Sequence, residues 1–246
     1  MHSFLSSALF ALCLTLAGQA AAQEQSPPVE LTTEQQAEVA AAAANVALIA
    51  TQGAYQNGAE PAYPDEERAL GHHGRVEITG VLGADGRLRY AIVSRSSRAP
   101  ALDAIGLASA IADQYTPALD AAGNAIPVTF TTSRSFYSFT SSQGVGAAMY
   151  TCPQFVLDMD WFKATWTEED LRNHYFYLLV RGLGTVANLS SGRGIGAIES
   201  NESYMARWNR AIETCRSHPN WRFAQAMRPE GDYIDNMARN AARRRN

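Results

Sequence analysis

The sequence predicts an α+β chain: a β-hairpin, a helix and a further β-strand form one small domain, and a small disulfide-linked α-helical domain follows. Three observations predict this class. Residues 75–95 alternate apolar and polar side chains around an Asp-Gly turn. Beyond residue 147, apolar side chains recur at helical spacing instead. One cysteine begins the first predicted helix of that region and another ends the third, Cys152 and Cys215.

Residues 1–22 are predicted to be a secretory signal peptide. The apolar stretch from Phe4 to Ala17 is shorter than the roughly 20 residues of a membrane span, and Ala20-Ala21-Ala22 is a small-x-small cleavage signal. We therefore expect a periplasmic protein. The alternative is an uncleaved N-terminus that anchors the chain in the inner membrane, facing the periplasm.

The length of 246 residues and a hydrophobic fraction of 46% suit two small domains. A net charge of −4 gives no electrostatic basis for a nucleic-acid partner. The run from Arg243 to Arg245 is expected to be solvated, with peripheral contact to anionic lipid as the alternative. Oligomeric state cannot be predicted from these features.

Residues 23–60 are predicted to be a polar leader and an alanine-rich helix. Thr32 or Thr33 stands at capping-box spacing from Gln35 or Gln36. The helix carries few apolar residues, so we expect it to flank the fold and not to join a core. Residues 54–60 are expected to be a linker.

Residues 61–140 contain the predicted sheet. Pro64 begins a short helix, and a strand follows from Arg75. Asp85-Gly86 predicts a hairpin turn, after which a second strand presents one apolar face. That face is expected to consist of Leu88, Tyr90 and Ile92.

A helix is predicted over residues 101–113 and a final strand over residues 124–139. Within that strand Val128, Phe130 and Phe136 share one phase, whereas Tyr137 and Phe139 do not. A phase change of this kind is typical of a β-bulge or an exposed edge.

Residues 147–246 are predicted to be helical, after a polar break at residues 141–146. The first helix presents one apolar face, made of Cys152, Phe155, Val156, Met159 and Phe162. Thr167 caps a second helix. Its predicted buried stripe is Leu171, Tyr175, Leu178, Leu179, Gly182 and Val186. A third helix carries Tyr204, Trp208, Ile212 and Cys215, and a short helix and a frayed tail follow.

Cys152 and Cys215 are expected to form a disulfide, because they are an even pair in an exported chain. A bridge across so long a loop stabilises by about 4 kcal/mol in the loop-entropy account. The alternatives are a metal pair and a catalytic thiol. Both are disfavoured because the sequence contains no Cys-x-x-Cys motif.

No motif of an enzyme, a cofactor site or a metal site stands out. His72-His73 is expected to be a solvated turn, with metal ligation as the alternative. The glycine-rich residues 192–196 lack dinucleotide-binding spacing, and Asp158 and Asp160 face different sides of a helix. His174 is expected to be packed or solvated. We expect no catalysis and no cofactor.

Residues 61–139 resemble the C-terminal domain of TonB-type energy transducers. The resemblance rests on an ordered set of short motifs: Pro61, Tyr63 and Pro64; Gly71 and Gly74; Val76; Asp85-Gly86; Ser96-Ser97; Leu102-Asp103; Pro117-Ala118; Gly123; and Pro127-Val128. One departure is Asp113, where the family tends to place an aromatic residue.

The resemblance implies a domain that binds a protein or peptide of the cell envelope, such as an outer-membrane receptor, by adding a strand to its last strand. The implied partner-binding edge is Thr129, Phe130, Thr131, Thr132, Ser133 and Arg134. The same polar run would also protect an edge against aggregation.

Two other functions follow from resemblances. The first is a divergent energy transducer for transport across the outer membrane, although the expected membrane anchor and proline-rich spacer are missing. The second comes from the helical residues, which resemble HdeA-type periplasmic acid-stress proteins through Cys152, Phe155, Cys215 and residues 220–227. That resemblance implies a holdase-like chaperone.

Overall fold

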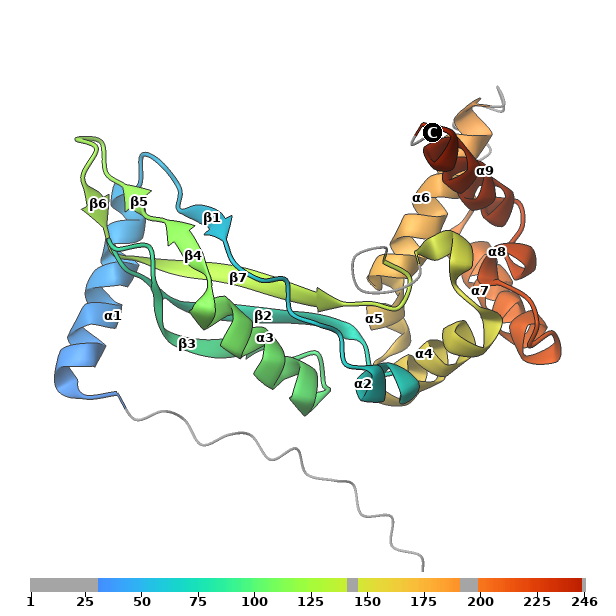
Figure 1. Cartoon of the computed structure of the whole chain (residues 1–246), viewed down its shortest axis with the longest axis horizontal. Coiled ribbons are helices and arrows are strands. Elements are labelled where there is room, and N and C mark those ends of the chain that lie inside the picture. Colours follow the sequence, from blue (N-terminus) through green and yellow to red (C-terminus); the bar gives the residue numbers. More distant parts are fainter. Residues whose placement is uncertain (1–30, 141–145, 191–198, 245–246) are drawn as a thin grey trace, which may run out of the picture.

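The computed structural model describes residues 31–140, 146–190 and 199–244. It has a sheet-containing part and a helical part, and the end of strand β7 (Val128–Phe136) leads from one to the other (Figure 1). The predicted signal peptide and the glycine-rich residues 192–196 lie outside the described residues.

The sheet-containing part comprises α1 (Thr33–Asn45), β1 (Ala54–Asn57), α2 (Asp65–Ala69), β2 (Gly74–Leu82), β3 (Leu88–Arg95), α3 (Pro100–Ala112), β4 (Gln114–Thr116), β5 (Ala118–Leu119), β6 (Ala125–Ile126) and β7 (Val128–Phe136). The helical part comprises α4 (Cys152–Thr165), α5 (Glu168–Arg172), α6 (Tyr175–Ser190), α7 (Asn201–Ser217), α8 (Phe223–Ala226) and α9 (Glu230–Arg243).

The main sheet has three antiparallel strands in the order β3-β2-β7. Helix α3 covers one face of this sheet, where Val76 and Ile78 of β2 are buried. The helix lies close because two of its three buried residues, Gly106 and Ala110, are small. A Cβ atom added at Gly106 would lie 3.2 Å from the Cβ atom of Val76.

The predicted apolar face of β3 is wrong after Leu88. Tyr90 has a left-handed φ of 50°, and the register with β2 shifts beside it. The shift reverses which side chains face α3, so Ala91 and Val93 pack against the core while Ile92 is 56% exposed. A bulge of this kind changes the phase that simple alternation predicts.

The predicted phase change near Phe136 has a different cause from a bulge. β7 pairs with β2 at every position from Val128 to Phe136 without a register shift. Phe136 is buried in the sheet core, whereas Tyr137 and Phe139, just beyond the strand, are buried in the core of the helical part. The segment therefore passes from the core of the sheet into the core of the helical part.

The first two elements of the chain, α1 and β1, lie against or beside the sheet. The capping box of α1 forms between Thr32 and Gln35. Glu38 of α1 accepts a hydrogen bond from the Tyr90 hydroxyl at 2.8 Å and pairs with Arg89, so this helix lies against the face opposite α3. Residues 54–57, predicted to be linker, instead form β1 and pair with β4.

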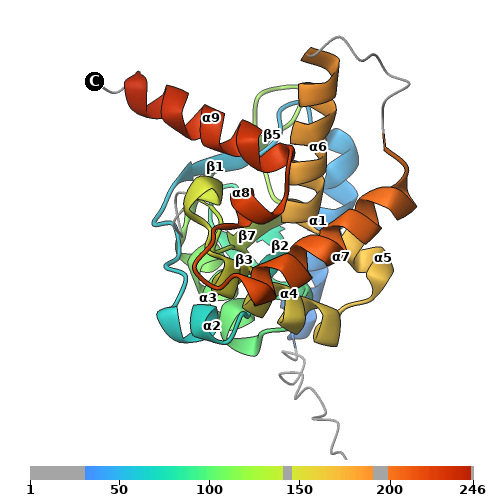
Figure 2. The ribbon, with the colours of Figure 1, turned by 90° about the vertical axis from the view of Figure 1, so that its right-hand side faces the viewer.

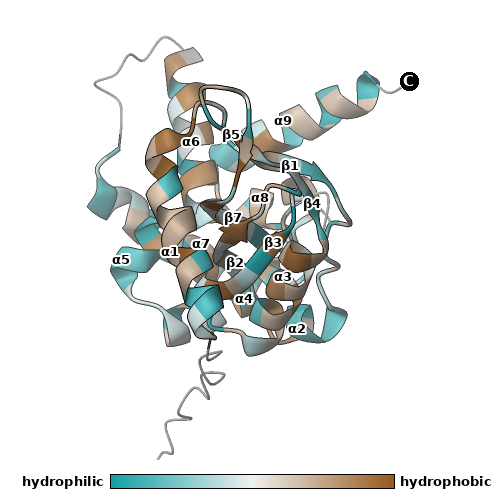
Figure 3. Ribbon diagram, turned by 90° about the vertical axis from the view of Figure 1, so that its left-hand side faces the viewer, coloured by the Kyte–Doolittle hydropathy of each residue, from teal (hydrophilic) through white to brown (hydrophobic). Residues whose placement is uncertain are grey.

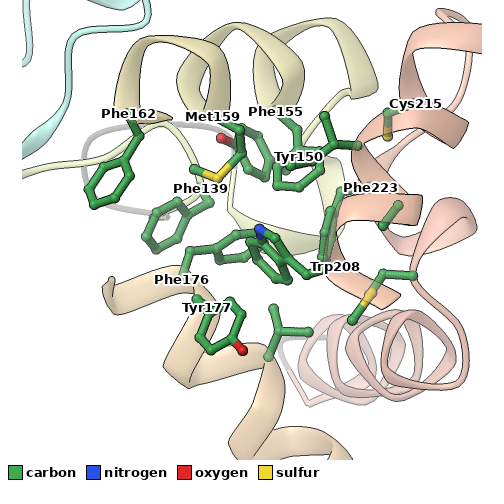
Figure 4. Packing of buried hydrophobic residues seen from close by; sticks show 14 of the residues in the cluster. Phe139, Tyr150, Phe155, Met159, Phe162, Phe176, Tyr177, Trp208, Cys215 and Phe223 are labelled. Carbon is green, nitrogen blue, oxygen red and sulfur yellow. The ribbon is translucent and has the colours of Figure 1, made fainter. Parts of the chain in front are cut away.

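Figure 2 shows the chain from the side of the helical part, and Figure 4 shows the aromatic core that holds its helices together. Trp208 lies at its centre, and Phe155, Phe176 and Phe223 surround its indole ring. The predicted disulfide between Cys152 and Cys215 is present, linking the start of α4 to the end of α7. The frayed tail predicted at the C-terminus is wrong, because residues 230–243 form α9.

The second predicted helix is two helices. It breaks at Asn173 and His174, between α5 and α6. The break resets the helical phase, so Phe176, Tyr177 and Val180 are buried instead of the predicted stripe. Of that stripe Leu171 is buried, while Tyr175, Leu178 and Val186 are about half exposed. Figure 3 shows these apolar segments along α6.

Candidate partner-binding edge and cleft

β7 is an edge strand within the described residues. It pairs with β2 on one side, and the three-stranded sheet ends there. Nine consecutive residues follow a regular antiparallel register, so the backbone is straight enough to accept another strand.

The opposite edge of the sheet, β3, is a poorer template. Its register with β2 is interrupted twice, and Tyr90 interrupts its extended backbone. Bulges twist an edge and disrupt the row of groups that a new strand would bind. β7 is therefore the better surface for strand addition.

The six predicted edge residues divide between the two faces of the sheet. Thr129, Thr131 and Ser133 pair with Val81, Thr79 and Glu77 on the face opposite α3. Phe130 packs edge-on against Tyr115, at 5.1 Å between ring centroids, on the α3 face. The Thr132 hydroxyl accepts a hydrogen bond from Arg134. The side chains of Phe130, Thr132 and Arg134 are therefore engaged within the fold, and these residues would contact a partner mainly through their backbone.

Arg134 is anchored inside the fold. Its guanidinium pairs with Asp113, which is 3% exposed, and its Nε donates to the Ser109 hydroxyl at 3.1 Å. Burial raises the pKa of Asp113, an effect that Arg134 opposes. The residue that departs from the family pattern, Asp113, thus holds the end of α3 to β7 by an ion pair.

A cleft of about 630 Å³ lies over the open face of the sheet, where the sheet meets the helical part. Its floor includes Arg75, Glu77, Arg95, Ser133 and Ser135 from all three strands. Its wall combines the apolar side chains of Tyr137, Phe162, Trp166, Tyr175 and Leu178 with polar residues that include Thr140, Asp170 and Asn173. Two small serines on β7 leave the cleft open at the edge strand.

The two arginines of the cleft differ in their surroundings. Arg95 is the register partner of Glu77, a carboxylate on the next strand. Arg75 is the register partner of Ser135. Its guanidinium group makes no hydrogen bond or ion pair with the residues that the structure describes. It is exposed. Arg75 is therefore a cation available to a ligand.

Residues 59–137 match the family of the Gram-negative bacterial TonB protein C-terminal. The predicted resemblance is thus confirmed for this part of the chain, which we call the TonB-like domain. Domains of this family are transducer domains of envelope proteins and bind proteins such as outer-membrane receptors. No curated protein matches the chain.

Two motifs of the TonB-like domain meet in the structure. The Ser96 hydroxyl donates to one oxygen of Asp103 at 2.5 Å, and the Ser97 amide donates to the other at 2.8 Å. The carboxylate thereby joins the end of β3 to the first turn of α3, where a negative charge is favoured. This motif positions the helix and does not contact the open edge.

A buried histidine pair joins the TonB-like domain to the helical part. His73 and His174 approach at 2.9 Å between their Nε2 atoms, and both are buried. The solvated turn predicted for His72-His73 is therefore wrong for His73. Only His72 is part-exposed, where it pairs with Glu67.

The hydrogen bonds determine the proton positions of this pair. His73 Nδ1 must donate to the Gly71 carbonyl, which only accepts, at 2.8 Å. Its Nε2 atom then accepts from His174, whose Nδ1 is buried without a hydrogen-bond partner. Burial lowers the pKa of both rings, for His174 well below the usual range. Both imidazoles are neutral at pH 7.

Asp158 forms a second buried polar group at the junction. It accepts from the Tyr150 hydroxyl at 2.5 Å and from the Gln154 amide at 2.6 Å. Burial raises its pKa, an effect that His73 and these hydrogen bonds oppose. Gln154 also donates to the Arg68 carbonyl at 2.9 Å, so the same side chain ties α4 to the TonB-like domain.

Sequence reasoning missed the cleft and the histidine pair, since residues that meet there come from positions about a hundred apart, as with His73 and His174. Within the described ranges, no cluster of three His, Cys, Asp or Glu side chains could hold a metal ion. None of the helices in the described part of the chain is long and apolar enough to cross a membrane.

Proposed function

We propose that this protein is a non-enzymatic periplasmic adaptor whose TonB-like domain binds an extended segment of a cell-envelope protein by strand addition at β7. The observation that carries the proposal is the regular, straight edge of β7 beside an open cleft. Main-chain hydrogen bonds to such an edge supply affinity, and alternate side chains supply selectivity.

The comparison between the two edges of the sheet supports this choice. β7 is unbroken along nine residues, whereas β3 is bulged. Helix α1 contacts β7 as well as Tyr90 and Arg89 of β3, so the comparison rests on the register alone. A partner strand at β3 would have to follow an interrupted register. The edge at β7 has no such interruption.

A matched pair of hydroxyl residues gives a direct test. Thr79, in the middle of the sheet, contacts Thr131 on β7 at 2.9 Å and Ser94 on β3 at 3.0 Å through its hydroxyl oxygen. Thr131 and Ser94 are both exposed. They therefore lie on the same face at opposite edges of the sheet, although the register partner of Thr79 on β3 is Ile92.

A photo-crosslinking amino acid is placed at Thr131 or at Ser94 in the full-length chain, which is expressed in its own host and irradiated. We expect a discrete crosslinked partner from position 131 that is absent or at least several-fold weaker from position 94. Mass spectrometry of the crosslinked peptide would identify the partner segment. Equal crosslinking from both positions, or none from 131, would contradict strand addition at β7.

A divergent energy transducer is the second candidate, because the family match is to a domain of envelope transport. The two candidates differ in the fate of residues 1–22. Mass spectrometry of the native protein should show a cleaved chain in the periplasmic fraction if it is an adaptor. Retention of these residues in the inner membrane would favour the transducer.

A further inference from the structure

We propose that the segment bound at β7 carries an acidic side chain that pairs with Arg75 and, two residues away, a bulky apolar side chain that packs against Tyr175 and Leu178. This inference rests on the proposed function and adds the chemistry of the partner. It follows from the rows of side chains on the open face of the sheet.

The first step is the phase of β7. Ser133 and Ser135 line the cleft, so the open face carries the odd-numbered residues of this strand. Side chains alternate between faces along a strand, and paired strands keep their side chains in rows. A strand added at β7 would therefore place every second side chain in line with Ser133 or Ser135.

The second step concerns charge in the row of Ser135. This row continues to Arg75 on β2. The added strand would lie two strand spacings from β2, which is about 10 Å. A glutamate or aspartate and an arginine reaching toward each other over a serine can span that distance. Arg75 is exposed and makes no ion pair with the described residues, so it gains a partner without losing one.

The neighbouring row favours a different residue. Ser133 lies opposite Glu77, which in turn lies opposite Arg95. Glu77 would repel a second carboxylate in this row, and it already faces a cation. The acidic side chain of the partner is therefore expected in the row of Ser135 and not in the row of Ser133.

The third step concerns the apolar wall. The next odd-numbered residue after Ser135 is Tyr137, whose ring lies 5.5 Å from that of Tyr175 between centroids. Tyr175 is 52% exposed and Leu178 is 47% exposed, and both line the cleft. A partner side chain two residues beyond the acidic one would cover these exposed surfaces. An aromatic or large aliphatic residue fits a wall of this kind.

Selection of random decapeptides displayed on phage tests the proposal with the full mature chain. We expect wild-type protein to enrich Glu or Asp two positions from Phe, Tyr, Trp or Leu. Arg75→Gln should lose the acidic preference but keep the apolar one, and Leu178→Ser should do the reverse. Arg172→Gln is the matched control, because Arg172 is an exposed arginine of α5 outside the cleft.

A selected peptide then measures the coupling between its acidic residue and Arg75. Replacing its acidic residue by the amide should weaken binding to wild-type protein roughly 5- to 10-fold, and binding to Arg75→Gln by less than 2-fold. Equal losses for both proteins would overturn the pairing. Enrichment without any acidic preference would overturn it as well.

Hydrogen exchange separates this inference from the proposed function. If selected peptides protect β7 amides but show no acidic or apolar pattern, strand addition stands and the cleft chemistry fails. If no peptide protects β7, strand addition itself fails. A concentration-dependent dimer that buries the cleft, seen by sedimentation, would replace the partner with a second copy of the chain.

Discussion

The two cores of this protein lie on opposite sides of one polypeptide segment and differ in kind. The core of the TonB-like domain is mainly aliphatic, and α3 approaches the sheet closely where Gly106 lies against Val76 of β2. The helical core is aromatic, centred on Trp208, and is linked covalently at Cys152–Cys215. The difference teaches that the sheet depends on close approach, whereas the helices depend on large rings and a crosslink.

Removal of the disulfide should cause the largest loss of stability, and this loss should fall on the helical core. We expect Cys152→Ser with Cys215→Ser to lower the free energy of unfolding of the helical part by about 4 kcal/mol, because the open chain regains loop entropy. Near-UV circular dichroism would report the aromatic core, and hydrogen exchange would report β2. If β2 lost protection together with the aromatic signal, the two cores would be one cooperative unit.

Acidification should weaken the contact between the cores. Burial lowers the pKa of His73 and His174 in the folded state, so the unfolded chain binds more protons below its ordinary histidine pKa of about 6.5. Stability should be fully present above that pH and fall by up to about 1.4 kcal/mol per pH unit for each ring as pH decreases.

Other charged groups at the junction modify this response. Asp158 has a raised pKa and takes up its proton more readily when folded, so it acts in the opposite sense at lower pH. Beside His73, the half-buried His72 pairs with Glu67, and Arg75 is exposed. Urea unfolding at pH 7.0, 6.0 and 5.5 measures the slope, which His174→Phe should reduce by about half. An unchanged slope in that variant would contradict the assignment.

The smallest effects should come from one substitution made in two helices. A Cβ atom at Gly106 would crowd Val76, whereas one at Gly182 of α6 would meet no described atom within 4 Å. We expect Gly182→Ala to stabilise by roughly 0.5–1 kcal/mol through helix propensity, and Gly106→Ala to lose that gain or to destabilise. Thermal unfolding of both variants against wild type would check the sign. Stabilisation by both would mean that α3 can move away from the sheet.

Local signals in the sequence were sufficient for several elements. The capping box at Thr32, the Asp85-Gly86 turn and the disulfide depend on residues near one another or on cysteine count, and the structure contains all three. The apolar phase of β3 and of α6 failed for one reason. In each case a local irregularity interrupts the element, at Tyr90 in β3 and at Asn173 and His174 before α6, and most of the predicted apolar side chains beyond it are exposed.

The edge residues of β7 could be named from sequence, but their roles could not. Alternation alone cannot show that Arg134 is already paired with Asp113, or that Ser133 and Ser135 open into a cleft. Those facts depend on which element covers each face of the sheet. Whether a partner binds there stays a prediction.

By itself, the sequence determined the order of the main elements (β2, β3, α3, β7, α4 and α7), the Asp85-Gly86 turn, the cap at Thr32 and the cysteine pair. These depend on backbone preferences, on contacts within a few residues or on cysteine count. Only the tertiary structure decided that His73 meets His174, that Tyr137 and Phe139 leave one core for another, and that Arg75 remains available. The physical reason is distance along the chain. Burial and charge pairing are set by which segments pack together, and a local sequence pattern holds no information about the distant segment that packs against it.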